Sequence, residues 1–383
     1  MTIYILLVLL ALLTFLLTDK KQSSLLTKTL LIMSILFSGL SYTNGWDWYG
    51  YNDYYYYIQN TGFYAVGEYN NFGIEYLYLI YMYLIGLSGA GFGFFVLVNS
   101  VIVNLLIFKF CKNTAINYAF LMLIFITVSY LRLELSTIRQ GLAVVIVMYA
   151  YSSILNERWK YAITAFILAI CLHRSAAIVI LFVPFILCVN RKAIHYYIVV
   201  LAVPFILLSS SLNSIFISLL SYANAGMLSV IVNKLIIYLS MNEAAKINPQ
   251  AILLLCLYLI SIYFCDVKNK KQMLFLNIMA CQVVISLYFT FLTQLIIMRL
   301  IYYFQIGWMY WIYILYKEYF RPQWLCLGLI LILVTFKLIL NFRYEADRAV
   351  FFPYYNVISS YYDESYGRSR DFILNKADEF PQG

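Results

Sequence analysis

Charged residues are scarce in this sequence of 383 residues. They make up 11% of the chain, whereas hydrophobic residues make up 64%. A charge at membrane depth costs several kcal/mol, about 3 or more, so chains in a membrane keep most ionisable groups in loops. The apolar runs are also too long and too frequent for a soluble core. The composition therefore excludes a soluble domain and predicts a chain that crosses a membrane many times.

Paired cysteines and alternating strand patterns are missing as well. None of the seven cysteines stands in a C-x-x-C pattern, so we expect neither a disulfide framework nor a metal site. Stretches such as 3–17 and 251–264 are apolar almost throughout, unlike the alternating strands of a membrane barrel. The net charge of +9 comes without a basic, aromatic-interleaved motif for nucleic acid. The predicted fold class is an all-α polytopic membrane protein with no nucleic-acid partner.

Apolar runs of about 17 to 25 residues predict the membrane spans. The first run has no basic segment before it and no small-residue cleavage site after it, so we expect a retained span rather than a signal peptide. We predict about twelve spans, at roughly residues 2–18, 28–43, 92–110, 114–131, 139–156, 158–172, 176–190, 194–211, 250–265, 272–290, 296–316 and 324–342.

Basic residues orient these spans, because short cytoplasmic loops carry an excess of Lys and Arg. If the loop with Lys20 and Lys21 is cytoplasmic, most other basic loops fall on the same side. The opposite side then receives the loop 44–73, which has no Lys or Arg, the loop 212–249 and the tail 343–383. We therefore expect residues 1–383 to form a single integral membrane domain with these three segments outside.

The segment 74–88 is apolar enough to cross the membrane, but counting it as a span would reverse the charge bias of every later loop. We predict a re-entrant or interfacial helix instead. The glycine-rich turn 86–93 would let the backbone reverse there.

Four arginines fall on the predicted outer side, where the orientation bias avoids cations. Guanidinium groups are suited to bidentate contact with phosphate oxygens and stay charged at any relevant pH. Each one alone could pair with a lipid phosphate or with one of the carboxylates Glu134, Asp53, Glu68 and Glu75. Together they favour a ligand that carries phosphate, and they are Arg132, Arg139, Arg174 and Arg299.

Three side chains are candidates for a general base. His173, beside Arg174 in a break between two apolar runs, could accept a proton from a sugar hydroxyl or could be a structural residue at a helix end. Glu75 opens an apolar helix, where it could interact with the helix N-terminus or act as a buried base. Asp53 lies in the aromatic segment 46–57, which suits sugar rings, although an interfacial aromatic belt would explain several of its tyrosines.

Short motifs, taken in order, resemble the EpsG-like branch of O-antigen and exopolysaccharide polymerases, the Wzy group. The resemblance covers most of the chain, and each motif on its own is short. The motifs are Asp53 with the following tyrosines, Glu75 with Tyr76, the helix start Ile138-Arg139-Gln140-Gly141-Leu142-Ala143, Leu172-His173-Arg174-Ser175-Ala176, Arg299 with Tyr302 and Tyr303, and Phe352-Pro353-Tyr354.

The resemblance implies a GT-C-like glycosyltransferase in the bacterial inner membrane with its active site facing the periplasm. Such an enzyme transfers glycan from undecaprenyl pyrophosphate to the next lipid-linked repeat unit and needs neither a cofactor nor an essential metal. Its partners would be the undecaprenyl-pyrophosphate-linked oligosaccharide, membrane lipid, a chain-length regulator and a flippase.

The resemblance also implies roles for individual residues. His173, Glu75 and Asp53 would be the catalytic candidates, with His173 narrowly favoured as the base. The substrate-binding residues would be Arg139, Arg299, Arg174, Arg132, Gln140, Tyr302, Tyr303 and Tyr354.

Other functions also suit these residues. A flippase for lipid-linked oligosaccharide would bind the same headgroup without chemistry, although no internal repeat or matched pair of broken helices is present. An O-antigen ligase or a polyprenyl-phosphate-sugar glycosyltransferase would recognise a similar donor lipid. A structural subunit of a polysaccharide complex would tolerate neutral residues at all four arginine positions.

Overall fold

The computed structural model describes residues 2–18, 24–64, 74–222, 249–290, 292, 294–342, 348, 350–352 and 354–360. The elements formed by these residues are helices, together with one isolated β-bridge between Ser41 and Asn356. The all-α prediction is therefore confirmed for the part of the chain that is described. The chain divides into two compact units, residues 1–176 with 320–383, and residues 177–319.

The first unit holds most of the candidate site residues. Its elements are α1 (Thr2–Thr18), α2 (Leu25–Gly39), α3 (Trp48–Thr61), α5 (Tyr76–Gly86), α6 (Phe92–Thr114), α7 (Tyr118–Phe125), the π-helix η2 (Ile126–Ser136), α8 (Ile138–Leu155), α9 (Trp159–Leu172), the start of the 3₁₀ turn η3 (Arg174–Ala177), α18 (Gln323–Asn341) and α20 (Val357–Ser360).

The second unit is also helical in its described residues. Its elements are α10 (Ile178–Cys188), α11 (Lys192–Leu207), α12 (Ser209–Tyr222), α14 (Pro249–Phe264), α15 (Lys270–Tyr288), α16 (Gln294–Ile301), α17 (Ile306–Ile314) and the π-helical turn η4 (Leu315–Tyr319). Helix α15 is its most buried long helix and packs against α10, α11, α14, α16 and α17.

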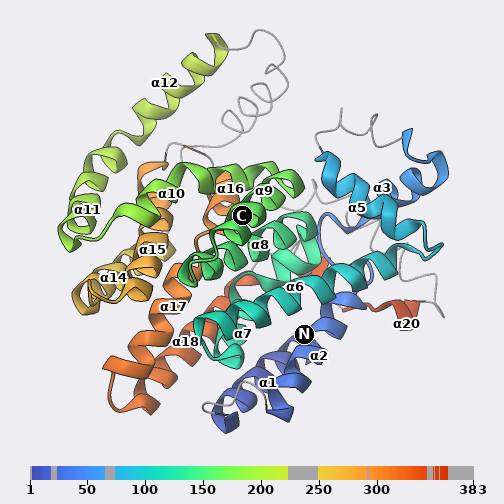
Figure 1. Ribbon diagram of the computed structural model, residues 1–383, viewed down its shortest axis with the longest axis horizontal. Helices are drawn as coiled ribbons and strands as arrows, with labels where there is room; N and C mark the ends of the chain where they lie inside the picture. Colours follow the sequence, from blue (N-terminus) through green and yellow to red (C-terminus); the bar gives the residue numbers. More distant parts are fainter. Residues whose placement is uncertain are drawn as a thin grey trace. The chain divides into compact units, whose positions relative to one another are not determined.

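Helix α8 is the buried centre of the first unit. It packs against both α6 and α9 (Figure 1), and all but three of its residues are buried. A helix that is apolar all round lies inside a protein or within a membrane, and the burial of α8 shows that neighbouring helices cover it. This packing fixes the position of its first turn, which carries Arg139 and Gln140.

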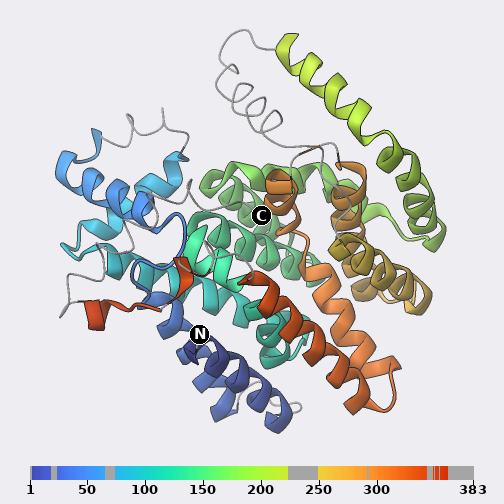
Figure 2. The ribbon, with the colours of Figure 1, turned by 180° about the vertical axis from the view of Figure 1, so that it is seen from behind.

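Helices α1 and α18 instead expose apolar side chains. Along α18, Leu325, Leu329, Ile332 and Phe336 are each at least half exposed. Helix α1, which lies beside α2 (Figure 2), exposes leucines in the same way. Long exposed apolar faces of this kind are typical of contact with lipid rather than water.

Five helices in the described residues are long and apolar enough to cross a membrane, or six if the bent pair formed by α11 and the following residues 211–218 is one span. Shorter apolar helices occupy several other predicted spans, so the count of about twelve and the GT-C-like arrangement stay predictions. The segment predicted as one span at 296–316 is divided into α16 and α17.

One further segment differs from the sequence-based expectation. The aromatic segment 46–57, expected as a loop, belongs largely to α3, because Trp48, Tyr51, Tyr55 and Ile58 form one buried stripe at helical spacing.

The segment 74–88, predicted as a re-entrant or interfacial helix, contains α5, which has 11 residues. At 1.5 Å per residue this helix covers about half of a hydrocarbon core of about 30 Å. Its placement in the membrane stays a prediction.

The span that begins at Tyr118 ends in an eleven-residue π-helix, η2. Its wider winding is visible at the end, where the backbone N–H of Thr137 donates to the carbonyl oxygen of Arg132, five residues earlier, at 2.7 Å. The helix therefore continues beyond the predicted end at 131 and contains Arg132 and Glu134. Stretches of π-helix are rare and often occur at functional sites.

Two glycines allow close packing against the end of η2. Gly45 has a φ of +101°, and a Cβ there would lie 2.1 Å from the carbonyl oxygen of Leu135. A Cβ on Gly141 would lie 2.3 Å from the carbonyl oxygen of Leu133. Gly45 therefore lets the turn before α3 approach η2, and Gly141 lets α8 start directly against η2, which places Arg139.

We expect Gly141→Ala to lower the stability of the folded protein by about 1–3 kcal/mol, because the added methyl group collides with backbone that cannot move aside cheaply. Thermal unfolding of the purified protein in detergent measures this. Gly328→Ala in α18, where a Cβ meets nothing within 4 Å, is the matched control. Equal unfolding midpoints for the two variants would contradict the packing argument.

Candidate functional site

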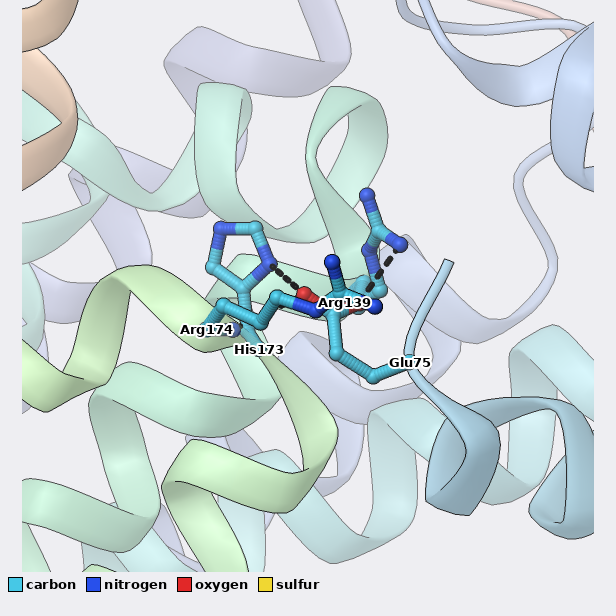
Figure 3. A network of polar contacts seen from close by, with 4 residues as sticks. All are labelled: Glu75, Arg139, His173 and Arg174. Atoms are coloured by element: carbon cyan, nitrogen blue, oxygen red, sulfur yellow. Dashed lines mark hydrogen bonds and ion pairs between the residues drawn. The ribbon is translucent and has the colours of Figure 1, made fainter. Parts of the chain in front are cut away.

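Four polar residues from three parts of the first unit meet at one point, three through their side chains and Arg174 through its backbone N–H. Glu75 comes from the start of α5, Arg139 from the first turn of α8, and His173 and Arg174 from the junction between α9 and η3 (Figure 3). Helix α5 packs against α9, and α8 packs against α9, which brings the three segments together. The structure therefore assembles four of the residues that the sequence singled out.

The carboxylate of Glu75 is the centre of this cluster. Its Oε2 accepts a hydrogen bond of 2.7 Å from Nη1 of Arg139, and its Oε1 accepts one of 2.8 Å from the backbone N–H of Arg174. Nδ1 of His173 lies 3.5 Å from Oε1 (Figure 3). Glu75 precedes α5 but makes no side-chain capping bond to it. Its role as a cap partner of this helix is therefore not observed.

The chain break at His173 positions two of the four residues. Helix α9 ends at Leu172, His173 is extended with φ −156° and ψ 112°, and Arg174 opens a 3₁₀ turn before α10. This turn directs the N–H of Arg174 toward Glu75. The break predicted between two apolar runs is confirmed.

Aromatic rings lie beside the guanidinium of Arg139. Cζ of Arg139 lies 6.0 Å from the ring centroid of Tyr78, whose ring is 5.8 Å from that of Tyr51. The charge of Arg139 also acts on the hydroxyl of Tyr51 and opposes the rise of its pKa. Nε of Arg139 is buried and has no acceptor among the described residues, so Glu75 does not use all donors of this side chain.

Electrostatics separate the possible roles of these groups. Burial alone would raise the pKa of Glu75, but the contact with His173, the charge of Arg139 and the N–H of Arg174 outweigh burial and lower it to about 2. Burial raises the pKa of Tyr51 to about 12, against the opposing charge of Arg139. Glu75 is thus a stable carboxylate and a weak base at neutral pH, whereas Tyr51 keeps its proton.

His173 is the better placed of the candidate bases. Its side chain is 14% exposed and that of Glu75 is 7% exposed, so both are largely withdrawn from solvent. Contact between Nδ1 and a fixed carboxylate orients the imidazole ring. Asp53, the third candidate, is exposed on α3. Within the described part of the chain it makes no hydrogen bond to the four residues of the Glu75 cluster.

Other predicted site residues of the first unit lie apart from this contact network. Arg132 lies on η2, and its charge acts on Lys337 of α18. Gln140 follows Arg139 and is buried. The hydroxyl of Tyr354 donates to the backbone carbonyl of Phe37, and the two rings stack 5.1 Å apart. Tyr354 therefore ties the chain after α18 to α2, which is a structural contact.

The remaining three predicted residues belong to the second unit. Arg299 is half-buried on α16, Tyr302 follows in the turn, and Tyr303 is fully buried there. Their role in binding phosphate stays a prediction. Glu68 and the charged residues of 223–248, which the sequence placed outside, lie beyond the described residues.

Tyr51 and Tyr78 were not singled out by the sequence. Each stands in a segment crowded with tyrosines, and no local pattern distinguishes the ones that face an arginine from the others. The helical spacing of the buried residues Trp48, Tyr51 and Tyr55 is the one signal that could have separated them.

Within the described residues, no group of three or more His, Cys, Asp or Glu side chains is arranged to hold a metal ion.

We expect Glu75→Gln to destabilise the protein at pH 7 by about 2–3 kcal/mol, because it removes a carboxylate whose pKa falls from 4.5 to about 2 on folding. The folded-state pKa is the lower one, so the stabilisation is complete above about pH 5 and is lost as the pH falls toward 2. Unfolding midpoints measured from pH 7 to pH 3 should therefore converge for wild type and variant. Asp53→Asn, at an exposed carboxylate, is the control, and a gap that stays constant with pH would contradict this assignment.

Comparison with known protein families confirms the resemblance that the sequence motifs suggested. The EpsG family matches residues 24–356, a range that includes all four residues of the cluster. No curated protein and no solved structure matches the chain significantly. Because the family match extends over far more than half of the sequence, this membrane protein belongs to the EpsG family.

Proposed function

We propose that the protein is a polysaccharide polymerase of the O-antigen or exopolysaccharide type. It transfers glycan from undecaprenyl pyrophosphate to the next lipid-linked repeat unit at the outer face of the bacterial cytoplasmic membrane. Membership of the EpsG family supports a polymerase-like membrane protein. The charge bias of the loops supports the orientation.

The observation that carries the proposal is the arrangement around Glu75. One carboxylate contacts an arginine side chain, an arginine backbone N–H and a histidine ring. The buried ion pair of Glu75 and Arg139 is neutral as a whole, and the exposed side chain of Arg174 adds one positive charge beside it. Such a place attracts an anion, and Nε of Arg139 is a buried donor with no acceptor in the described chain.

The proposed reaction breaks the bond between the anomeric carbon of the donor glycan and the pyrophosphate oxygen. A hydroxyl oxygen of the acceptor sugar forms the new bond to that carbon, and its proton passes to Nε2 of His173. Undecaprenyl pyrophosphate leaves with the bonding electrons. Arg139 and Arg174 stabilise the charge that develops on the leaving phosphate, where fixed cations lower the barrier most.

Glu75 is a positioning residue in this mechanism. It holds Nδ1 of His173 and one arm of Arg139, so the base and the cation keep a fixed separation. Its low pKa makes it a poor proton acceptor, and it therefore supports the reaction through its neighbours rather than by taking the proton.

We expect Arg139→Lys to lower the rate of polymerisation about 100-fold or more, because an ammonium group does not replace a bidentate fork. The assay incubates purified protein with its cognate undecaprenyl-pyrophosphate repeat unit in detergent with EDTA and resolves the product ladder. Arg158→Lys, at an exposed arginine before α9, is the matched control.

Different products in this assay would favour different functions. A ladder that Arg139→Lys leaves unchanged would place the phosphate site elsewhere. Transfer of the lipid-linked unit across a vesicle membrane without a ladder would identify a flippase. A single transfer to another lipid acceptor would identify a ligase.

His173 should control the acid side of the pH–rate profile. We expect His173→Gln to lower kcat about 100-fold or more and to abolish the fall in rate at low pH, because the proton acceptor is removed. Glu75→Gln should lower the rate but keep a histidine-dependent pH profile. A profile that is unchanged by His173→Gln and lost in Glu75→Gln would make Glu75 the base.

A further inference from the structure

A pocket of about 390 Å³ lies in the first unit, outside the Glu75 cluster. It is formed by α3, the start of α6, the end of α2 and the start of α20. Aromatic rings dominate its wall, and none of its lining residues is charged. Its main side chains are Tyr42, Trp48, Asn52, Tyr56, Phe92 and Phe94.

Helix α3 presents one stripe to this pocket and another to the arginine. Trp48, Asn52 and Tyr56 follow at intervals of four residues, so they lie on the same face of the helix, and all three line the pocket. The hydroxyl of Tyr51, one residue before Asn52, lies where the charge of Arg139 acts on it. The neutral pocket and the charged cluster are therefore joined by adjacent faces of a single helix.

Glycines at the start of α6 leave space in the wall. Gly91 and Gly93 both line the pocket, and a Cβ on Gly91 would lie 3.0 Å from the hydroxyl oxygen of Tyr56. Tyr55 donates a hydrogen bond of 2.6 Å to the carbonyl oxygen of Ala90, which fastens α3 to the segment before α6. These contacts fix α3 against the start of α6 and keep the pocket open between them.

The polar groups at the pocket indicate what it binds. Asn52 supplies an amide, Tyr42 and Tyr56 carry hydroxyls, and the aromatic rings provide apolar faces. The indole N–H of Trp48, a residue only 4% exposed, has no acceptor among the described residues. An isoprenoid chain would leave such groups unsatisfied, whereas a hydroxylated ring offers both oxygens and an apolar C–H face.

We propose that this pocket binds a neutral sugar ring of the lipid-linked glycan. The inference rests on the proposed function and deepens it, because it assigns the sugar and the pyrophosphate to different faces of α3. A neutral hexose ring suits a pocket that has amide and hydroxyl groups but no charged side chain.

The test measures binding of the free sugar separately from catalysis. The probe is the oligosaccharide released by mild acid from lipid-linked repeat units extracted from the protein's own host. Saturation-transfer NMR on protein in nanodiscs gives its Kd. We expect Asn52→Ala and Tyr56→Ala each to weaken binding about tenfold, as the loss of one hydrogen bond or one stacked ring predicts.

Matched variants separate a direct contact from a loss of folding. Tyr56→Phe keeps the ring and should bind more tightly than Tyr56→Ala. Tyr64→Ala, at a tyrosine that is 90% exposed and does not line the pocket, should bind like wild type. All variants should keep the wild-type unfolding midpoint. In the ladder assay, Asn52→Ala and Tyr56→Ala should raise KM about tenfold with kcat within about twofold of wild type.

Several results would overturn the pocket assignment. These are no binding of the oligosaccharide to wild type, equal binding by Asn52→Ala, or displacement of the sugar by undecaprenyl phosphate alone. The polymerase proposal fails separately. Oligosaccharide binding that depends on Asn52, without any ladder, would keep the pocket and reject the polymerase. A product ladder, together with variants that bind the oligosaccharide like wild type, would keep the polymerase and reject the pocket.

Discussion

The ion pair between Glu75 and Arg139 is the contact on which the arrangement of the site depends. Both side chains are largely buried, and removing either would leave the other as a buried charge without compensation. The same carboxylate also accepts the N–H of Arg174, so one residue joins α5, α8 and the end of α9. The carboxylate of Glu75 therefore fixes three segments that are far apart in the sequence.

This contact also determines, in the proposed mechanism, which side chain can accept the proton. The donors that hold Glu75 stabilise its charged form, so the residue that organises the site is a poor base. Glu75 orients the ring of His173 through Nδ1. Arg139 gives one arm to Glu75 and still has a buried donor available for a ligand. In the proposed mechanism, Glu75 therefore organises the site and His173 accepts the proton.

Much of the helical pattern could be predicted from the sequence, because apolar runs separated by polar breaks report directly on helices in a membrane. The break at His173 was found in this way. Glu75 was one of several carboxylates that the arginines could pair with, but the sequence could not select the pair with Arg139, since 64 residues separate them and no periodicity relates the two positions. The π-helical end of η2 and the division of 296–316 were also missed, because changes in winding leave little trace in composition. The aromatic segment was assigned to a loop because its tyrosines hid a stripe at helical spacing.

The geometry of α3 explains why that segment is more than an aromatic belt. A belt needs aromatic residues at the membrane surface but not at defined angles around a helix. Here Tyr51 must face Arg139 while Trp48, Asn52 and Tyr56 face the pocket, and neighbouring residues on a helix differ in direction by about 100°. A shift of one residue in register would turn both stripes away from their partners. The positions of these side chains around α3 therefore connect a neutral pocket with a charged cluster. Aromatic character alone would not produce this arrangement.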